Sequence, residues 1–152
     1  MDTIAPKTPA ALPFAAWQAM SPIAAALEVH ARVAALPPSL RTAALAWLKP
    51  ERDLAAAMET NDPRPPLHGV PYVLKDLFDL AGVPTQAGST FLNSVRGTPT
   101  RDSAIALRLR ELGAGCAGKT HLVEFAAGLF GDNSHYGDCP HPQYPDRLSG
   151  GS

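Results

Sequence analysis

Apolar positions in the first third of the chain recur at helical spacing. Residues 1–20, rich in alanine and proline, are expected to form an irregular lead-in. Ser21 followed by Pro22 is a typical helix start, because serine caps the first turn and proline tolerates the first helical position. Prolines then separate the periodic stretches, since proline cannot continue a helix. The pattern predicts helices over residues 22–36, 39–48 and 51–59, followed by a stiff linker over 63–66.

A different pattern begins after this linker. Residues 70–75 are mostly β-branched, aromatic or apolar and predict a short buried strand. Helical spacing returns over residues 102–112, and an apolar run over 114–118 predicts a second strand. A further helix is expected over 121–127, and this alternation indicates an α/β unit with parallel strands. Residues 128–152 have no periodicity, and ordered loops of that length tend to be functional.

The composition of the chain argues against several classes of function. The 152 residues carry 13 Lys and Arg against 14 Asp and Glu, so the net charge is −1 and we expect no nucleic-acid partner. No apolar run approaches the length of a membrane span, and prolines interrupt the first twenty residues where a signal peptide needs an apolar core. Two cysteines do not make a disulfide framework, so we expect a cytoplasmic protein with reduced thiols and no membrane partner.

The residue with the clearest chemical potential is Lys75, at the end of the first predicted strand. Lysine is rarely buried without a partner, and an amine that loses its proton easily can act as a general base. Such a base can activate a hydroxyl nucleophile directly or through a second hydroxyl, with Ser152, Ser149 or Ser89 as candidates. The alternative is that Lys75 extends to solvent or pairs with a nearby aspartate.

The C-terminal loop holds two weaker candidates. His135, Asp138, Cys139 and His141 are zinc-ligand types, but their spacing matches no standard zinc arrangement. Cys139 and His141 could also form a thiol and base pair, although such pairs usually come from different elements. For the zinc-ligand types we favour a solvated loop, for Cys139 and His141 we favour a reduced thiol near the surface, and we predict no metal or other cofactor.

The segment from Gly113 to Thr120 fits the phosphate-loop pattern Gly-x-x-x-x-Gly-Lys-Thr. A nucleotide-binding module, or another non-catalytic fragment, is therefore the alternative function. Against it, a phosphate loop should follow a buried strand, whereas the residues before Gly113 are predicted to be helical. Its apolar residues 114–117 are better suited to being the strand themselves.

Several short stretches stand in a characteristic order between residues 65 and 152: Gly69–Asp76, Gly82–Thr85, Ala87–Ser89, Pro99, Asp102–Ala104, Leu112–Ala114, Gly118–His121, Glu124–Ala126, Asn133–Ser134, Tyr136–Gly137 and Arg147–Ser152. In identity, order and spacing they resemble the amidase signature family. The resemblance implies an α/β/α sandwich with a mixed central sheet, of which this chain is an incomplete N-terminal part. It suggests a helical preface over 1–64 and the first part of the amidase signature domain over 65–152. In the family, the Gly-Lys-Thr follows a short strand and binds no nucleotide.

The resemblance implies a Ser–cis-Ser–Lys triad that hydrolyses linear carboxamides by acyl transfer. Lys75 corresponds to the lysine base and Ser152 to the bridging serine, whose peptide bond is cis in the family. The family's nucleophilic serine lies roughly two dozen residues beyond the bridging serine, outside these 152 residues. We therefore expect the 152 residues alone to be inactive and to expose an apolar sheet edge.

Further expectations concern the substrate and the partners. By resemblance, the segment Gly128, Leu129 and Phe130 borders a small-molecule amide substrate. A homodimer, or the remainder of the same polypeptide, is the expected protein partner. The family often has asparagine where this chain has His121, a position that is not catalytic.

Overall fold

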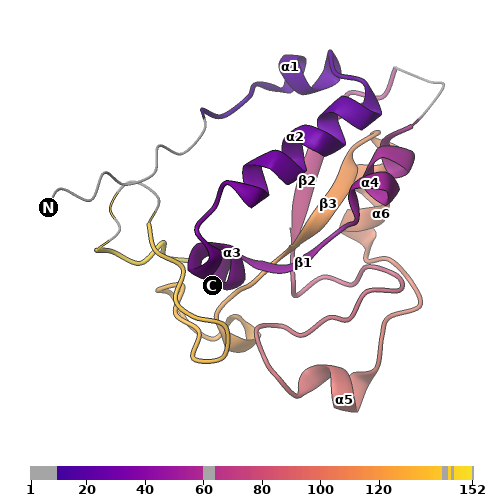
Figure 1. Cartoon of the computed structure of the whole chain (residues 1–152). Helices are drawn as coiled ribbons and strands as arrows, with labels where there is room; N and C mark the ends of the chain where they lie inside the picture. The colour runs from indigo at the N-terminus through magenta and orange to yellow at the C-terminus, as the bar shows by residue number, and fades with distance from the viewer. Residues whose placement is uncertain (1–9, 60–63, 142–143, 145, 152) are drawn as a thin grey trace, which may run out of the picture.

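The computed structural model describes residues 10–59, 64–141, 144 and 146–151 (Figure 1). These residues form a mixed α/β structure with short helices on both sides of a small sheet. In chain order the elements are α1 (Phe14–Gln18), α2 (Pro22–Ala34), α3 (Pro38–Ala44), β1 (Leu45–Leu48), α4 (Glu51–Met58), β2 (Pro71–Lys75), α5 (Leu92–Arg96), α6 (Ala104–Glu111), β3 (Gly115–Thr120) and the 3₁₀ turn η1 (Glu124–Ala126).

The sheet has three strands in the order β1-β3-β2. Strands β2 and β3 are parallel, as the alternation of strand and helix predicted, and β1 joins β3 antiparallel. The sheet is therefore mixed, which confirms the expected fold class. Because β1 lies within residues 1–64, the preface contributes a strand to this sheet. The boundary at residue 64 stays a prediction.

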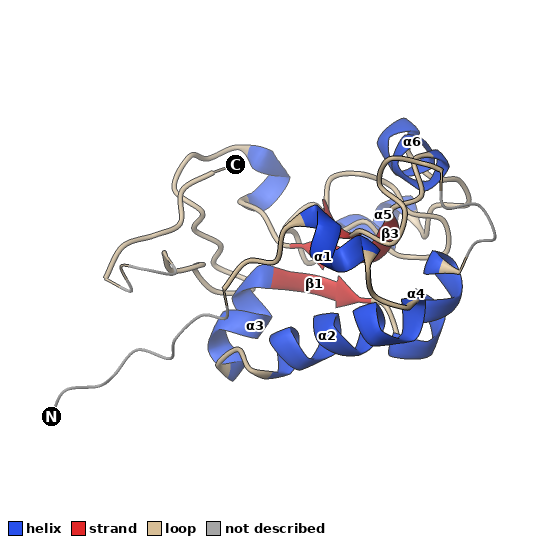
Figure 2. Ribbon diagram, turned by 90° about the horizontal axis from the view of Figure 1, so that it is seen from above, coloured by secondary structure: helices blue, strands red, loops and turns tan. Residues whose placement is uncertain are grey.

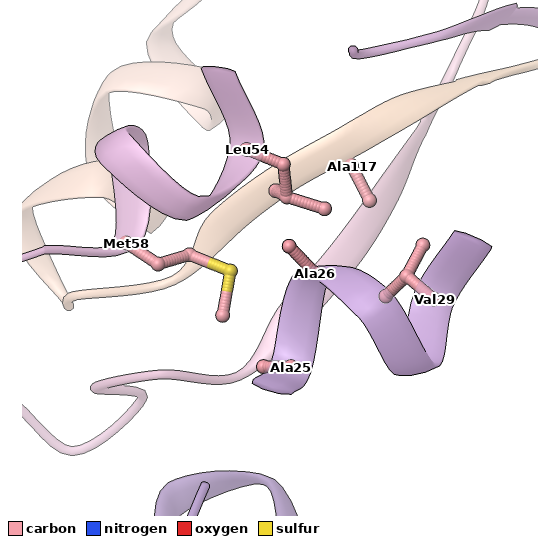
Figure 3. Close-up of a cluster of buried hydrophobic side chains, with 6 residues drawn as sticks. All are labelled: Ala25, Ala26, Val29, Leu54, Met58 and Ala117. Carbon is pink, nitrogen blue, oxygen red and sulfur yellow. The ribbon is translucent and has the colours of Figure 1, made fainter. Parts of the chain in front are cut away.

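The core lies on both faces of β3. On one face, α2 and α4 pack their small and apolar side chains against Ala117 (Figure 3). On the other face, α6 contributes Ala106, which packs with Cys116 and Leu74. The adjacent residues Cys116 and Ala117 serve opposite faces because strand side chains alternate. Figure 2 shows the resulting layers, with α2 and α4 on one side of the sheet and α6 on the other.

Helix α2 begins as the sequence predicted. Ser21 adopts an extended backbone, and its side-chain oxygen accepts a hydrogen bond from the Ala24 N–H at 3.2 Å. Pro22 occupies the first helical position, where its missing N–H costs nothing. Among the described residues, no helix has the length and apolar character needed to cross a membrane.

Two predicted helices were wrong in part. The helix expected over 39–48 ends at Ala44, and residues 45–48 form strand β1 because they pair with β3. The helix expected over 121–127 shrinks to the turn η1, since Phe125 has a φ of +52° and its N–H donates to the distant Ala87 carbonyl. Long-range pairing overrides local helix propensity at both places. The short helices α1 and α5 were not predicted.

Candidate active site

The predicted base Lys75 is the last residue of β2, at the edge where the parallel strands β2 and β3 both end. It is half-buried, and in the β2–β3 register it pairs with Thr120, the last residue of β3. The following N–H, that of Asp76, donates to the Thr120 carbonyl at 2.9 Å. Functional sites of open α/β sheets gather at the carboxyl ends of strands, so Lys75 lies where a catalytic group is expected.

A cavity of about 190 Å³ adjoins this edge of the sheet. Thr120 and His121 line it from the end of β3, and Gly150 and Gly151 line it from the C-terminal loop. Lys75 is not among the lining residues and is connected to the cavity through its strand partner Thr120. The cavity therefore separates the end of the sheet from the residues directly before the predicted Ser152.

The predicted substrate segment, residues 128–130, pairs with the C-terminal loop through its backbone. The Gly150 N–H donates to the Phe130 carbonyl at 3.2 Å, and the Gly151 N–H donates to the Leu129 carbonyl at 3.1 Å. The side chains of Leu129 and Phe130 are left 75% and 68% exposed. Ser152, with its expected cis peptide bond, lies outside the described residues, so its role and that of Gly128–Phe130 stay predictions.

Asn133 holds the loops around the cavity together. Its buried Nδ2 donates to the carbonyls of Gly88 at 2.9 Å and Leu122 at 2.8 Å. Its Oδ1 accepts the backbone N–H groups of His135 at 2.9 Å and Tyr136 at 3.1 Å. One amide side chain therefore joins three segments that are distant in sequence. The family resemblance included Asn133, but no role followed from its sequence position.

The structure adds a buried ion pair that the sequence analysis did not predict. Asp76, 1% exposed, and Lys119, fully buried, face each other with the Lys119 Nζ and Asp76 Oδ1 atoms 2.5 Å apart. This contact is a close ion pair rather than a directed hydrogen bond, and Lys119 also donates to the Pro84 carbonyl and the Thr85 hydroxyl. A signal existed in the sequence, since both charges stand at the ends of strands that we predicted to be parallel.

The comparisons with known proteins agree with this geometry. The sequence model of the family described as Amidase matches residues 24–152, most of the chain. This chain belongs to the Amidase family. The match begins inside α2, so it covers part of the segment that the sequence analysis had placed in a helical preface.

This Amidase chain is similar to several known enzymes over part of their length. It is 41% identical over 88 residues to AtzE, which belongs to the 1-carboxybiuret hydrolase of Pseudomonas sp. (strain ADP), a match that covers 58% of this chain and 19% of the relative. It is 41% identical over 101 residues to a component of the glutamyl-tRNA(Gln) amidotransferase of Salinispora tropica, covering 66% of this chain and 20% of the relative. Its fold matches the allophanate hydrolase of Kluyveromyces lactis with a TM-score of 0.76 and 31% identity, over 93% of this chain and 24% of that one. The matched region is thus about a fifth to a quarter of each relative's length.

The phosphate-loop alternative is not supported in this Amidase chain. Residues 115–120 are strand β3 itself rather than a loop, and the Lys119 ammonium is sequestered by Asp76. Gly118 is needed for a protein contact, because a Cβ there would lie 2.5 Å from the Trp47 carbonyl of β1. The lysine that a nucleotide phosphate would need is therefore already used inside the fold.

The candidate zinc ligands of the C-terminal loop do not gather into a metal site. No group of three metal-binding side chains gathers among the described residues. His135 instead faces Glu124, with 3.2 Å between Nε2 and Oε1. The backbone of Cys139 bonds to Gly131 and Ser149, which fixes the loop beside the cavity.

The remaining serine candidates lie in different surroundings. Ser89 is fully buried, and its Oγ accepts the Phe91 N–H at 3.3 Å. Ser149 lines the cavity and donates to the Gly150 carbonyl at 3.2 Å. Of these two hydroxyls, Ser149 is the one that the fold brings to the cavity.

His121 is the distinctive residue of the cavity. Its ring stacks on Tyr136, with centroids 3.9 Å apart and planes inclined by 19°. Burial lowers the pKa of His121, and the negative charge of Asp76 only partly opposes that effect. Its Nδ1 is buried and has no hydrogen-bond partner among the described residues. Burial therefore favours the neutral form of the ring.

Proposed function

We propose that this chain supplies the base and the relay serine of a hydrolase that cleaves linear carboxamides by a Ser–cis-Ser–Lys mechanism. Lys75 is the base, Ser152 is the proton relay, and these residues form the first part of a longer Amidase. The observation that carries the proposal is that one cavity is lined both by Thr120, the strand partner of Lys75, and by Gly150 and Gly151, the residues that precede Ser152. Membership of the Amidase family supports the reaction class.

The proposed proton path begins with Lys75 in its neutral form. Its amine takes the Ser152 hydroxyl proton while Ser152 takes the proton of the nucleophilic serine, whose oxygen attacks the amide carbonyl carbon. The tetrahedral intermediate collapses as the C–N bond breaks and the proton returns through Ser152 to the leaving amine. Water then attacks the acyl ester while the lysine again accepts a proton, and that proton returns through Ser152 to the nucleophilic serine as the ester C–O bond breaks and the acid is released. Backbone N–H groups stabilise the oxyanion.

The substrate we propose is a small amide that lies along residues 128–130. The backbone of this segment is held by Gly150 and Gly151, so it can border the scissile bond near Ser152. Relatives that belong to a hydrolase or an amidotransferase support C–N bond chemistry and a partner protein. We propose a cytoplasmic enzyme whose protein partner is the rest of its own polypeptide or a second copy.

Lysine substitution tests this proposal. The protein produced from its natural gene is first weighed by intact mass spectrometry, and ammonia release from acetamide, propionamide and benzamide is then measured. We expect Lys75→Met to lower kcat by about 10²–10⁴-fold, the usual contribution of a general base. Lys49→Met is the matched control, because Lys49 follows the opposite edge strand β1 and lies over the Trp47 ring.

Two results would refute the proposal. The first is unchanged hydrolysis in Lys75→Met. The second is absence of amide hydrolysis by a protein that has the length of its relatives and melts cooperatively. The second result would favour the alternative of a non-catalytic binding role.

A further inference from the structure

Asp76, the residue that follows the proposed base, has a partner at each polar group of its backbone and its side chain. The Asp76 N–H donates to the Thr120 carbonyl at 2.9 Å, and its carbonyl accepts the Ala87 N–H at 3.0 Å. Its Oδ2 accepts the Gln86 N–H at 3.0 Å, and its Oδ1 faces the Lys119 ammonium. Lys75 therefore precedes a residue whose position is fixed by bonds to β3 and to the loop after β2.

Lys119, from the neighbouring strand β3, is the ion-pair partner of Asp76. Its ammonium contacts Asp76 and also donates to the Pro84 carbonyl at 3.2 Å and to the Thr85 hydroxyl at 3.0 Å. Thr85 in turn donates to Asp79 at 2.9 Å. A fully buried ammonium is costly unless it is paired and hydrogen-bonded, and here it has both kinds of partner.

The two buried charges lie on either side of Lys75, because Asp76 follows it in the chain and Lys119 pairs with Leu74 in the β2–β3 register. An unpaired carboxylate beside a lysine favours the ammonium form, whereas a compensated carboxylate does not. The other titratable groups packed around the pair are Asp79, which is bound to Arg96, together with His121 and Tyr136. Among these groups, Lys119 is the cation in direct contact with Asp76.

We propose that Lys119 is a positioning residue for the lysine base. By pairing with Asp76 it cancels the negative charge next to Lys75 and fixes the end of β2, which lets Lys75 act as a neutral amine. This inference rests on the proposed function of Lys75. It assigns to the Gly-Lys-Thr segment an electrostatic role in amide hydrolysis in place of phosphate binding.

The pH profile of kcat/KM tests the proposal in the full-length enzyme, with the amide that is hydrolysed fastest. The value of kcat/KM falls at low pH because the base becomes protonated, and this falling part of the profile is its acid limb. We expect Lys119→Met to move the limb to higher pH by about one unit, the order of magnitude of the effect that a single unit charge has on a neighbouring titratable group. Asp76→Asn should move it to lower pH, and the double variant should restore its position. Thr85→Val, which removes a hydroxyl but no charge, should leave the limb in place.

The outcomes distinguish the inference from the function on which it rests. If Lys75→Met abolishes hydrolysis but the two charge variants leave the limb unmoved or shift it in the same direction, Lys119 is only structural. If Lys75→Met remains active, the proposed function itself fails. Should one single variant not melt cooperatively, the other carries the test, and an unmoved limb in that variant would overturn the proposal. Should neither melt cooperatively, the double variant is measured, and a limb displaced from that of the parent enzyme would overturn the proposal.

Discussion

Replacement of Asn133 by alanine should destabilise the protein far more than an average polar substitution. The side chain makes two donated and two accepted hydrogen bonds, all between 2.8 and 3.1 Å. Each contributes about 1 kcal/mol net, and carbonyls left buried without a donor add to the loss, so we expect roughly 4–5 kcal/mol in total. The affected carbonyls belong to Gly88 and Leu122, so the wall of the cavity should loosen as well.

Urea denaturation of the full-length protein measures this effect. Asn133→Ala should lower the denaturation midpoint without changing the slope m, because only stability changes. Asn93→Ala is the matched control, since Asn93 is exposed in α5, and it should stay within about 0.5 kcal/mol of the parent. If the two variants lose the same stability, Asn133 does not organise these loops and the reasoning is wrong.

Three further predictions follow from burial and close contact. Gly88→Ala should cost roughly 3 kcal/mol in urea denaturation, because its φ is +71° and a Cβ would lie 2.5 Å from the Leu122 carbonyl. Gly82→Ala, with a φ of +78° and open space around it, should cost only about 1 kcal/mol, and equal losses would contradict the clash. Because burial lowers the pKa of His121 in the folded state, stability should fall as the pH drops below about 6.5, and His121→Gln should remove that part of the acid sensitivity in melts across pH. Burial raises the pKa of the Cys116 thiol, so a thiol reagent at pH 8 should modify Cys139 first and Cys116 only on unfolding, and equal rates would refute this.

Much of the frame could be predicted from sequence, because it depends on local patterns. The alternation of apolar strands and helices after residue 70 predicted the parallel pair β2 and β3, and Ser21 with Pro22 predicted the start of α2. The order of short motifs identified the family, and Lys75 was found because a lysine that ends an apolar strand is unusual. The inferences about strands, helices and Lys75 use only residues close together in the chain, whereas the family follows from the order of short motifs over residues 65–152.

Tertiary structure alone decided the features that depend on distant partners. Residues 45–48 look helical by composition and become β1 because the free edge of β3 offers backbone hydrogen bonds. The pairing of Asp76 with Lys119 and the two bonds that Asn133 donates, to Gly88 and Leu122, join segments that are separated in sequence. Local propensity carries no information about such contacts, because burial and strand order determine which polar groups must satisfy one another. The sequence therefore determined the family and the proposed base, while the packed fold determined the surroundings in which that base lies.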